Sequence, residues 1–172
     1  MNKRQSWIIR GMVPILALGA LAGFSQPSTA SQVQVSCKSD NSTPKVIISL
    51  SKEGTTRDYT VFNFLPQYFS ATDVVQNCQK IAKDLQTLYE TDNFQYLTAD
   101  KLNNQSVVCA VERRGIGCNH YNAKVLFSFR GDDNPSQGLY EILGSGFKQA
   151  QPPDARTISR TYTATKPGWW PF

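Results

Sequence analysis

The sequence predicts an α+β fold, an antiparallel sheet of about five strands with two helices packed on one face and two disulfides. Two patterns lead to this prediction. Short segments of alternating apolar and polar residues come in groups, three before the first helix and two after it, rather than alternating with helices. One long segment carries its apolar residues at intervals of three and four, which is typical of an amphipathic helix. The predicted order is βββ-α-ββ-α.

The predicted strands span residues 32–37, 45–50, 58–65, 105–111 and 124–130. In the first of them Val33, Val35 and Cys37 share one face, because successive side chains of a strand point to opposite sides. A polar loop is expected over residues 97–104, and a turn over residues 113–117 joins the last two strands.

The first helix is predicted over residues 72–91, with Ser70 or Thr72 as its N-cap. Its apolar stripe consists of Val74, Cys78, Ile81, Leu85 and Leu88. A second helix is predicted to open at Asn134 and Pro135, a capping residue followed by proline at the first helical position. That helix carries Leu139, Ile142, Leu143 and Phe147.

Residues 1–30 have the three parts of a secretory signal peptide. A cationic start is followed by an apolar run over residues 11–24, and Ser28 and Ala30 then stand at the positions of small residues before a cleavage site. The apolar run is shorter than the roughly 20 residues that a spanning helix needs. We therefore expect an exported protein in the periplasm, the thylakoid lumen or the medium, with a folded domain over residues 31–150.

The net charge argues against a nucleic-acid-binding protein. The whole chain carries 18 basic and 13 acidic residues, a formal charge of +5. Three of the cations, Lys3, Arg4 and Arg10, belong to the predicted leader, which leaves 15 basic against 13 acidic residues and a net charge of +2. A strong nucleic-acid binder is far more basic.

All four cysteines follow the leader, and an even number in an oxidising compartment predicts disulfides. None of them forms a C-x-x-C pair, which argues against a thioredoxin-type site and a zinc ribbon. Four cysteines permit three pairings. Cys109 and Cys118 flank the predicted turn, whereas Cys37 and Cys78 face the core from a strand and a helix, so we predict Cys37–Cys78 and Cys109–Cys118.

Residues that could carry catalysis are few. His120 is the only histidine, so a metal site built on a histidine pair is excluded and a catalytic triad would have to use it. The run 132–134 (Asp-Asp-Asn) lacks the spaced acidic ligands of an EF-hand and fits the start of a helix better. Arg113 and Arg114 at the turn could bind an anion, although exposed arginines in turns are usually solvated. We expect no metal, no cofactor and no catalytic residue.

Residues 151–172 lack a periodic apolar face and are expected to form a flexible tail that can be removed after Ala150 without unfolding the domain. Its aromatic end is the least ordinary feature of the sequence. The residues expected to contact a membrane or partner are Trp169, Trp170, Phe172, Arg156, Arg160 and Lys166. The alternative is that these rings pack back on the domain or form a disordered end.

Several motifs occur together in a familiar order. The segments 77–79 (Asn-Cys-Gln), 104–109 (Asn-Gln-Ser-Val-Val-Cys) and 125–129 (Val-Leu-Phe-Ser-Phe) follow the strand of Cys37 and are themselves followed by Asn134 and Pro135. In these motifs the chain resembles the cyanobacterial circadian oscillating protein family over about residues 33–147. The resemblance implies an exported protein that associates peripherally with membranes and whose abundance, in the founding member, follows a daily rhythm. It implies no catalytic residues.

We therefore expect an exported, non-enzymatic interaction module that associates with a membrane surface or a membrane protein and binds no nucleic acid. Two alternatives stay open, an extracytoplasmic enzyme that uses His120 and a redox-responsive disulfide protein. The sequence alone names neither a ligand nor an oligomeric state.

Overall fold

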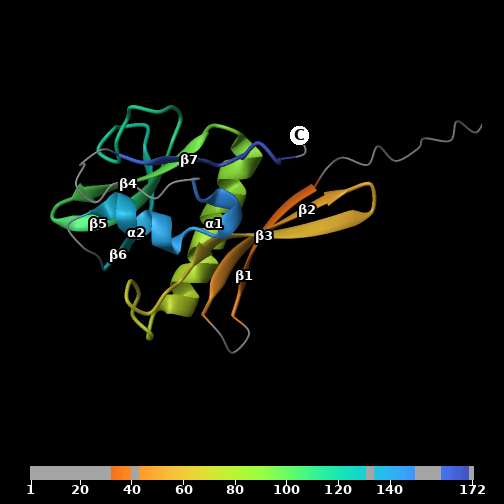
Figure 1. Cartoon of the computed structure of the whole chain (residues 1–172), viewed down its shortest axis with the longest axis horizontal. Coiled ribbons are helices and arrows are strands. Elements are labelled where there is room, and N and C mark those ends of the chain that lie inside the picture. The colour runs from red at the N-terminus through yellow and green to blue at the C-terminus, as the bar shows by residue number, and fades with distance from the viewer. Residues whose placement is uncertain (1–31, 40–42, 131–133, 150–159, 171–172) are drawn as a thin grey trace, which may run out of the picture.

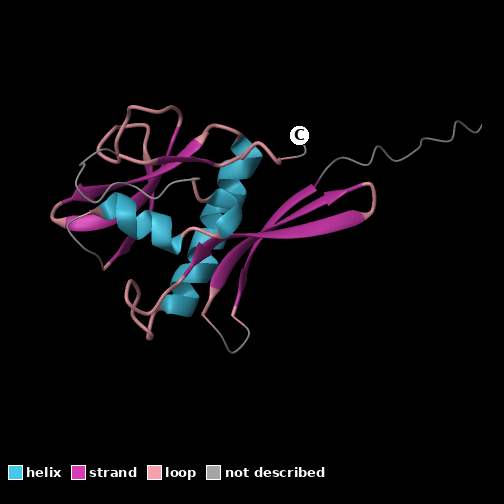
Figure 2. Ribbon diagram, in the orientation of Figure 1, coloured by secondary structure: helices cyan, strands magenta, loops and turns pink. Residues whose placement is uncertain are grey.

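The structure, a computed structural model, describes residues 32–39, 43–130, 134–149 and 160–170 of the chain. The predicted leader lies outside the described residues. The described elements are β1 (Gln32–Lys38), β2 (Lys45–Lys52), β3 (Thr55–Asn63), α1 (Val74–Thr91), β4 (Tyr96–Leu102), β5 (Gln105–Val111), β6 (Lys124–Phe129), α2 (Pro135–Ile142), the 3-10 helix η1 (Ser145–Phe147) and β7 (Tyr162–Ala164). They form two antiparallel sheets, in the orders β1-β2-β3 and β6-β5-β4-β7 (Figures 1 and 2).

The α+β class is confirmed, but the strands divide differently from the prediction of about five strands in one sheet. The described residues contain seven strands in two sheets. One additional strand, β4, occupies the region predicted as a polar loop over residues 97–104. Its polar side chains have distant partners, because the hydroxyl of Thr98 donates to the carbonyl of Thr161 (2.8 Å) and Asp100 pairs with Arg160 (2.8 Å). A local pattern cannot reveal such pairing.

The three-stranded sheet packs one face against α1 and closes its outer edge with a side chain of that helix. The backbone N–H of Val35 donates to Oε1 of Gln86 (2.7 Å), and Nε2 of Gln86 donates to the carbonyl of Val33 (3.2 Å). The amide of Gln86 therefore takes the place of a peptide group from a neighbouring strand. This arrangement protects the β1 edge from pairing with another chain.

Helix α1 buries the stripe that the sequence predicts. Cys78, Ile81, Leu85 and Leu88 are all buried, and the helix contacts β1, β2 and β6. The predicted cap was wrong. Asp73 is the N-cap residue and makes no side-chain cap bond, while the hydroxyls of Ser70 and Thr72 bond to each other (2.9 Å).

Helix α2 begins as predicted. Oδ1 of Asn134 accepts from the backbone N–H of Ser136 (3.1 Å) and Gln137 (3.3 Å), and Pro135 occupies the first helical position. After the helix the chain meets the edge of β3. The N–H of Gly144 donates to the carbonyl of Val61 (2.9 Å), and a Cβ at this glycine would lie within 1.9 Å of a β3 carbonyl oxygen. Only glycine permits this approach.

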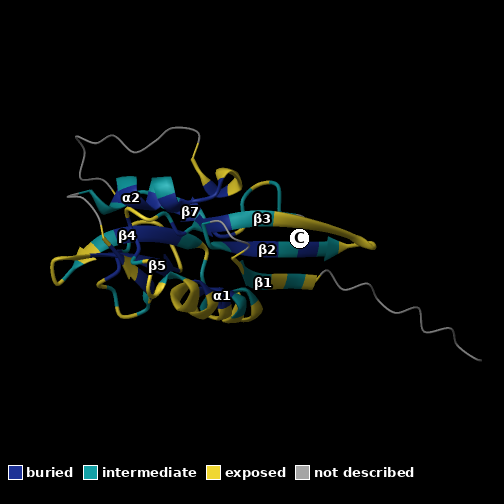
Figure 3. Cartoon of the chain, turned by 90° about the horizontal axis from the view of Figure 1, so that it is seen from below, coloured by how far each residue is buried: buried dark blue, intermediate teal, exposed yellow. Residues whose placement is uncertain are grey.

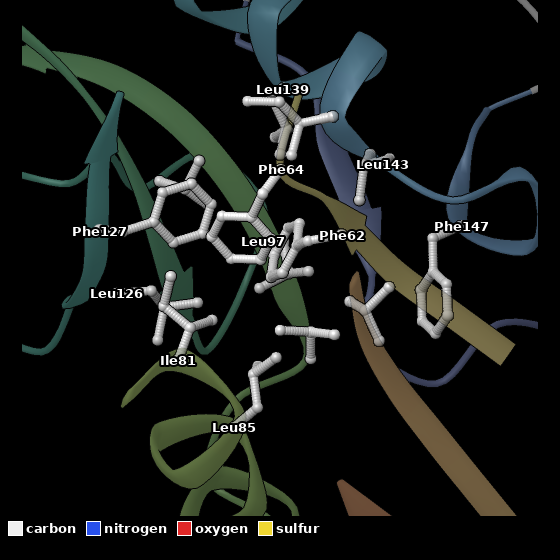
Figure 4. Packing of buried hydrophobic residues seen from close by; sticks show 14 of the residues in the cluster. Phe62, Phe64, Ile81, Leu85, Leu97, Leu126, Phe127, Leu139, Leu143 and Phe147 are labelled. Carbon is white, nitrogen blue, oxygen red and sulfur yellow. The ribbon is translucent and has the colours of Figure 1, made fainter. Parts of the chain in front are cut away.

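The core is shared by both sheets and both helices (Figure 4). The ring of Phe62 from β3 meets the ring of Phe127 from β6 edge to face, with centroids 5.1 Å apart. Ile81 and Leu85 of α1 and Leu139 of α2 complete this contact between the sheets. Burying each such side chain contributes about 1.5–3 kcal/mol, so this cluster dominates the stability of the domain.

The opposite face of the four-stranded sheet carries a second, smaller cluster. Val107, Cys109 and Val111 of β5 pack there with Cys118. The segment 112–123, which the Cys109–Cys118 disulfide ties back to β5, covers this face. Both faces of β5 are therefore buried, and only its first residue is exposed.

The C-terminal segment is not the flexible tail that the sequence suggests, at least over residues 160–170. Strand β7 pairs with β4, with Leu97 opposite Thr163. The ring of Trp170 stacks on Tyr89 of α1 at 5.2 Å between centroids, and the phenol of Tyr89 donates to the carbonyl of Thr165 (2.8 Å). Burial raises the pKa of the Tyr89 phenol well above its ordinary value.

We expect truncation after Ala150 to destabilise the domain, contrary to the expectation from sequence. The truncation removes β7, Trp169 and Trp170, and we expect it to lower the free energy of unfolding by at least about 3 kcal/mol. Denaturant unfolding of the two chains measures this difference. As a control, Gly168→Ala adds a methyl group that meets nothing within 4 Å and should leave stability unchanged. A truncated chain as stable as the full chain would refute the packing role of this segment.

Candidate functional site

Both predicted disulfides are present, and together they account for all four cysteines. Cys37–Cys78 joins β1 to α1 across 41 residues, and Cys109–Cys118 closes a loop of nine. Cys78 and Cys109 are fully buried, while Cys37 is partly exposed. In the loop-entropy account the long loop contributes about 4 kcal/mol and the short one about 3 kcal/mol. These disulfides fit a protein folded in an oxidising, extracytoplasmic compartment.

His120 lies two residues after Cys118, outside the loop that the short disulfide closes, and makes local contacts there. Its Nδ1 accepts from the backbone N–H of Asn122 (3.2 Å), and its ring lies 4.4 Å from that of Tyr121. The nearby carboxylate of Glu112 accepts from the side-chain amide of Asn122 (3.1 Å) rather than from the imidazole. Within the described ranges, no group of three His, Cys, Asp or Glu side chains is arranged to hold a metal ion.

The two arginines of the predicted turn are both exposed, and the guanidinium of Arg114 lies 5.2 Å from the ring centre of Tyr96. The acidic residues of the 132–134 run lie outside the described residues.

The tail residues predicted to contact a membrane or partner are dispersed over the domain surface. Trp169 stacks on Tyr59 at 3.9 Å between ring centroids, and its Nε1 donates to the carbonyl of Gly146 (3.0 Å). Lys166 pairs with Asp92 (2.5 Å), just as Arg160 pairs with a carboxylate of β4. Arg156 and Phe172 lie outside the described residues.

An apolar hollow lies next to the start of β2 and the start of α1. It has a volume of about 420 Å³, and Phe69, Ser70 and Arg130 line both this hollow and a more polar one of about 380 Å³. We call the two together the Phe69 groove. The apolar residues that line the first hollow are Pro44, Phe64, Pro66, Phe69, Ala71 and Val74.

Five separate parts of the chain build the Phe69 groove, which explains why a local sequence pattern does not reveal it. They are the segment before β2, the β3–α1 connection, the first turn of α1, the β4–β5 turn with the start of β5, and the end of β6. The N–H of Arg130 donates to the carbonyl of Tyr68 (2.9 Å), which fixes the end of β6 to the β3–α1 connection. The one local signal is Pro66 among the aromatic residues Phe64, Tyr68 and Phe69, directly after the strand predicted over residues 58–65.

A carboxylate on α2 holds the wall of the groove. The hydroxyl of Tyr68 donates to Oε2 of Glu141 (2.8 Å), and Nε2 of Gln137 donates to Oε1 (3.1 Å). These two bonds, the one from Tyr68 above all, lower the pKa of Glu141 below its ordinary value. The ring of Tyr68 also packs edge to face on Phe129 at 5.7 Å. The Tyr68 side chain therefore attaches the β3–α1 connection to α2 through its hydroxyl and to β6 through its ring.

A third hollow, of about 330 Å³, lies on the inner face of the β2–β3 hairpin. Its apolar part is formed by Leu50, Tyr59 and Trp169, and Lys52 and Arg57 add two cations. On the other face of the same hairpin, hydrogen bonds from Lys38 and Ser49 lower the pKa of Asp58 below its ordinary value.

The chain matches the model of the family described as circadian oscillating protein COP23 over residues 34–166. The chain belongs to this family. The match spans β1 to β7, so the COP23 family region includes the C-terminal strand, both disulfides and the Phe69 groove. No curated protein gives a match to the chain, and no solved structure does.

We expect the Tyr68–Glu141 contact to make stability depend on pH. Because the folded-state pKa of Glu141 is lowered, its stabilisation is present above the unfolded-state pKa of about 4.3 and is lost as the pH falls through the folded-state value. We expect Glu141→Gln to cost about 1 kcal/mol at pH 7, a modest value because the carboxylate is partly exposed. Urea unfolding of both proteins between pH 3 and pH 7 tests this. A difference that stays constant over that range would show that the charge of Glu141 is not involved.

Proposed function

We propose that this member of the COP23 family is an exported, non-enzymatic interaction module, and that it associates peripherally with a membrane through the Phe69 groove. The observation that carries the proposal is the groove itself. It combines an apolar hollow of about 420 Å³ with the cation of Arg130 at its rim. Such a combination suits an anionic amphiphile, whose apolar part enters the hollow while its headgroup meets the cation.

Export is supported by the signal-peptide pattern of residues 1–30 and by two disulfides that fit an oxidising compartment. None of the helices in the described ranges has the length and apolar character needed to cross a bilayer. We propose the periplasm or the thylakoid lumen as the compartment, since both offer a membrane surface.

The aromatic tail is a weaker candidate for the membrane contact than the sequence suggests. Trp169 and Trp170 are stacked on Tyr59 and Tyr89, so moving either ring into a headgroup layer would first break its contact with the domain. Contact between a membrane and the wall of the Phe69 groove does not require such a stack to be broken. Its residues Pro66 and Ala71 are already exposed, and Val75 beside it on α1 is 41% exposed.

We expect Ala71→Asp to weaken membrane association about tenfold, which corresponds to about 1.4 kcal/mol. The new carboxylate would face the acyl region or an anionic headgroup, and both contacts are unfavourable. Its place just before the N-terminus of α1 suits a negative charge, so the fold should be kept. Co-sedimentation with vesicles that contain an anionic phospholipid measures the effect.

Val125→Asp is the matched control, because Val125 of β6 is 43% exposed and does not line the groove. We expect it to bind the vesicles as well as the unmodified chain does. Equal losses from both substitutions would mean that a general charge effect, and not the groove, governs the association.

A further inference from the structure

The start of β3 forms an open strand edge of the three-stranded sheet. This sheet has β1 and β3 as its edges, and Gln86 already closes the β1 edge. The second half of β3 is also covered, because Phe62 bridges to Leu143 and the carbonyl of Val61 accepts from Gly144. Residues 55–58 are exposed, and the hairpin projects away from the rest of the domain (Figures 1 and 3).

The outward hydrogen-bonding groups of this edge can be assigned from the hairpin geometry. Glu53 and Gly54 both have positive φ (50° and 77°) and form a two-residue turn between Lys52 and Thr55. Lys52 and Thr55 close this turn as a hydrogen-bonded pair, and hydrogen-bonded and non-hydrogen-bonded pairs alternate along an antiparallel ladder. The backbone N–H and C=O groups of Thr56 and Asp58 therefore point away from β2. In the described part of the chain no backbone group of another segment pairs with them.

We propose that residues 55–59 of β3 bind an extended segment of a partner protein, which adds a fourth strand to this sheet. The unpaired amide groups supply the backbone recognition. The hollow formed by Leu50, Tyr59 and Trp169 lies on the inner face beside this edge and accepts an apolar side chain. Arg57 lies on the same face, since it is opposite Leu50 in the register. It selects an acidic side chain of the partner segment, two residues from the apolar side chain that enters the hollow.

Charge distribution supports a partner with an acidic side chain on the inner face. Asp58 points to the outer face, where the ammonium of Lys38 (2.6 Å) and the hydroxyl of Ser49 (2.6 Å) already bind its carboxylate. The hollow on the inner face is lined by two cations, Lys52 and Arg57, and by one carboxylate, Glu53 of the turn, which leaves an excess of positive charge there. Among the described residues no carboxylate forms an ion pair with Arg57.

A second copy of the chain fits this edge poorly. Antiparallel pairing of β3 with itself about a two-fold axis places Arg57 opposite Arg57 when centred on that residue, and Asp58 opposite Asp58 when centred there. Like charges directly opposite one another are destabilising. A pairing centred on Thr56 would join the two strands only near their turns. The edge therefore suits a heterologous segment.

The probe for this proposal is a fluorescein-labelled peptide, Thr-Glu-Thr-Phe-Thr-Glu-Thr. Its glutamates and phenylalanine share one face of a strand, and its palindromic sequence fits the edge in either direction. We expect saturable binding in fluorescence anisotropy, and at least tenfold weaker binding of the analogue with lysine in place of glutamate. The full disulfide-bonded chain is used throughout.

Thr56→Pro is the decisive variant, because proline removes an outward N–H that β2 does not use and is tolerated on edge strands. We expect it to weaken peptide binding at least tenfold, whereas Thr56→Ala, which keeps the N–H, should change it less than twofold. Thermal unfolding of both variants checks the fold. Arg57→Gln should weaken binding of the glutamate peptide and leave binding of the lysine analogue unchanged.

The proposal is overturned if the unmodified chain does not bind the peptide, or if Thr56→Pro binds it as well as Thr56→Ala does. It is also overturned if sedimentation reveals a dimer that Thr56→Pro abolishes, since the occupant would then be a second copy. This test is independent of the membrane contact proposed above. The β3 edge and the Phe69 groove lie toward opposite ends of β2, so Thr56→Pro should leave vesicle binding unchanged and Ala71→Asp should leave peptide binding unchanged.

Discussion

The burial of the apolar stripe of α1 in a core shared by both sheets is the constraint on which the rest of the structure depends. The two sheets are separate hydrogen-bonded units. What joins them is side-chain packing, in which Ile81 and Leu85 meet residues of both sheets and Phe62 meets Phe127. The Cys37–Cys78 disulfide then fixes β1 to the same helix. Losing this core would separate the elements that form the Phe69 groove.

The C-terminal segment completes this arrangement. Trp170 stacks on the end of α1 and Trp169 on β3, so the segment bridges the helix and the three-stranded sheet. Through β7 it also pairs with the four-stranded sheet. An aromatic pair that reads as a membrane anchor in the sequence thus has a structural role. Its position beside the hairpin hollow also gives one wall to the proposed peptide site.

Sequence reasoning succeeded where the signal is local and periodic. The spacing of Cys78, Ile81 and Leu85 predicts α1. The core-facing positions of Cys37 and Cys78 predict one disulfide, and the predicted turn between Cys109 and Cys118 predicts the other. It failed where a residue acquires its role from a distant partner. Thr98 looks like part of a polar loop until its bond to the carbonyl of Thr161 is seen, and Gln86 looks like an ordinary surface residue until it closes the β1 edge. The Phe69 groove was beyond local reasoning for the same reason, because no single segment contains it.

Hydrogen–deuterium exchange of the full chain, free and bound to anionic vesicles, tests the central claim that the Phe69 groove and not the aromatic tail meets the membrane. The account predicts added protection of backbone amides in residues 64–77 and at Arg130, with little change over residues 160–170. Protection confined to residues 160–170, with the β3–α1 connection unchanged, would contradict it.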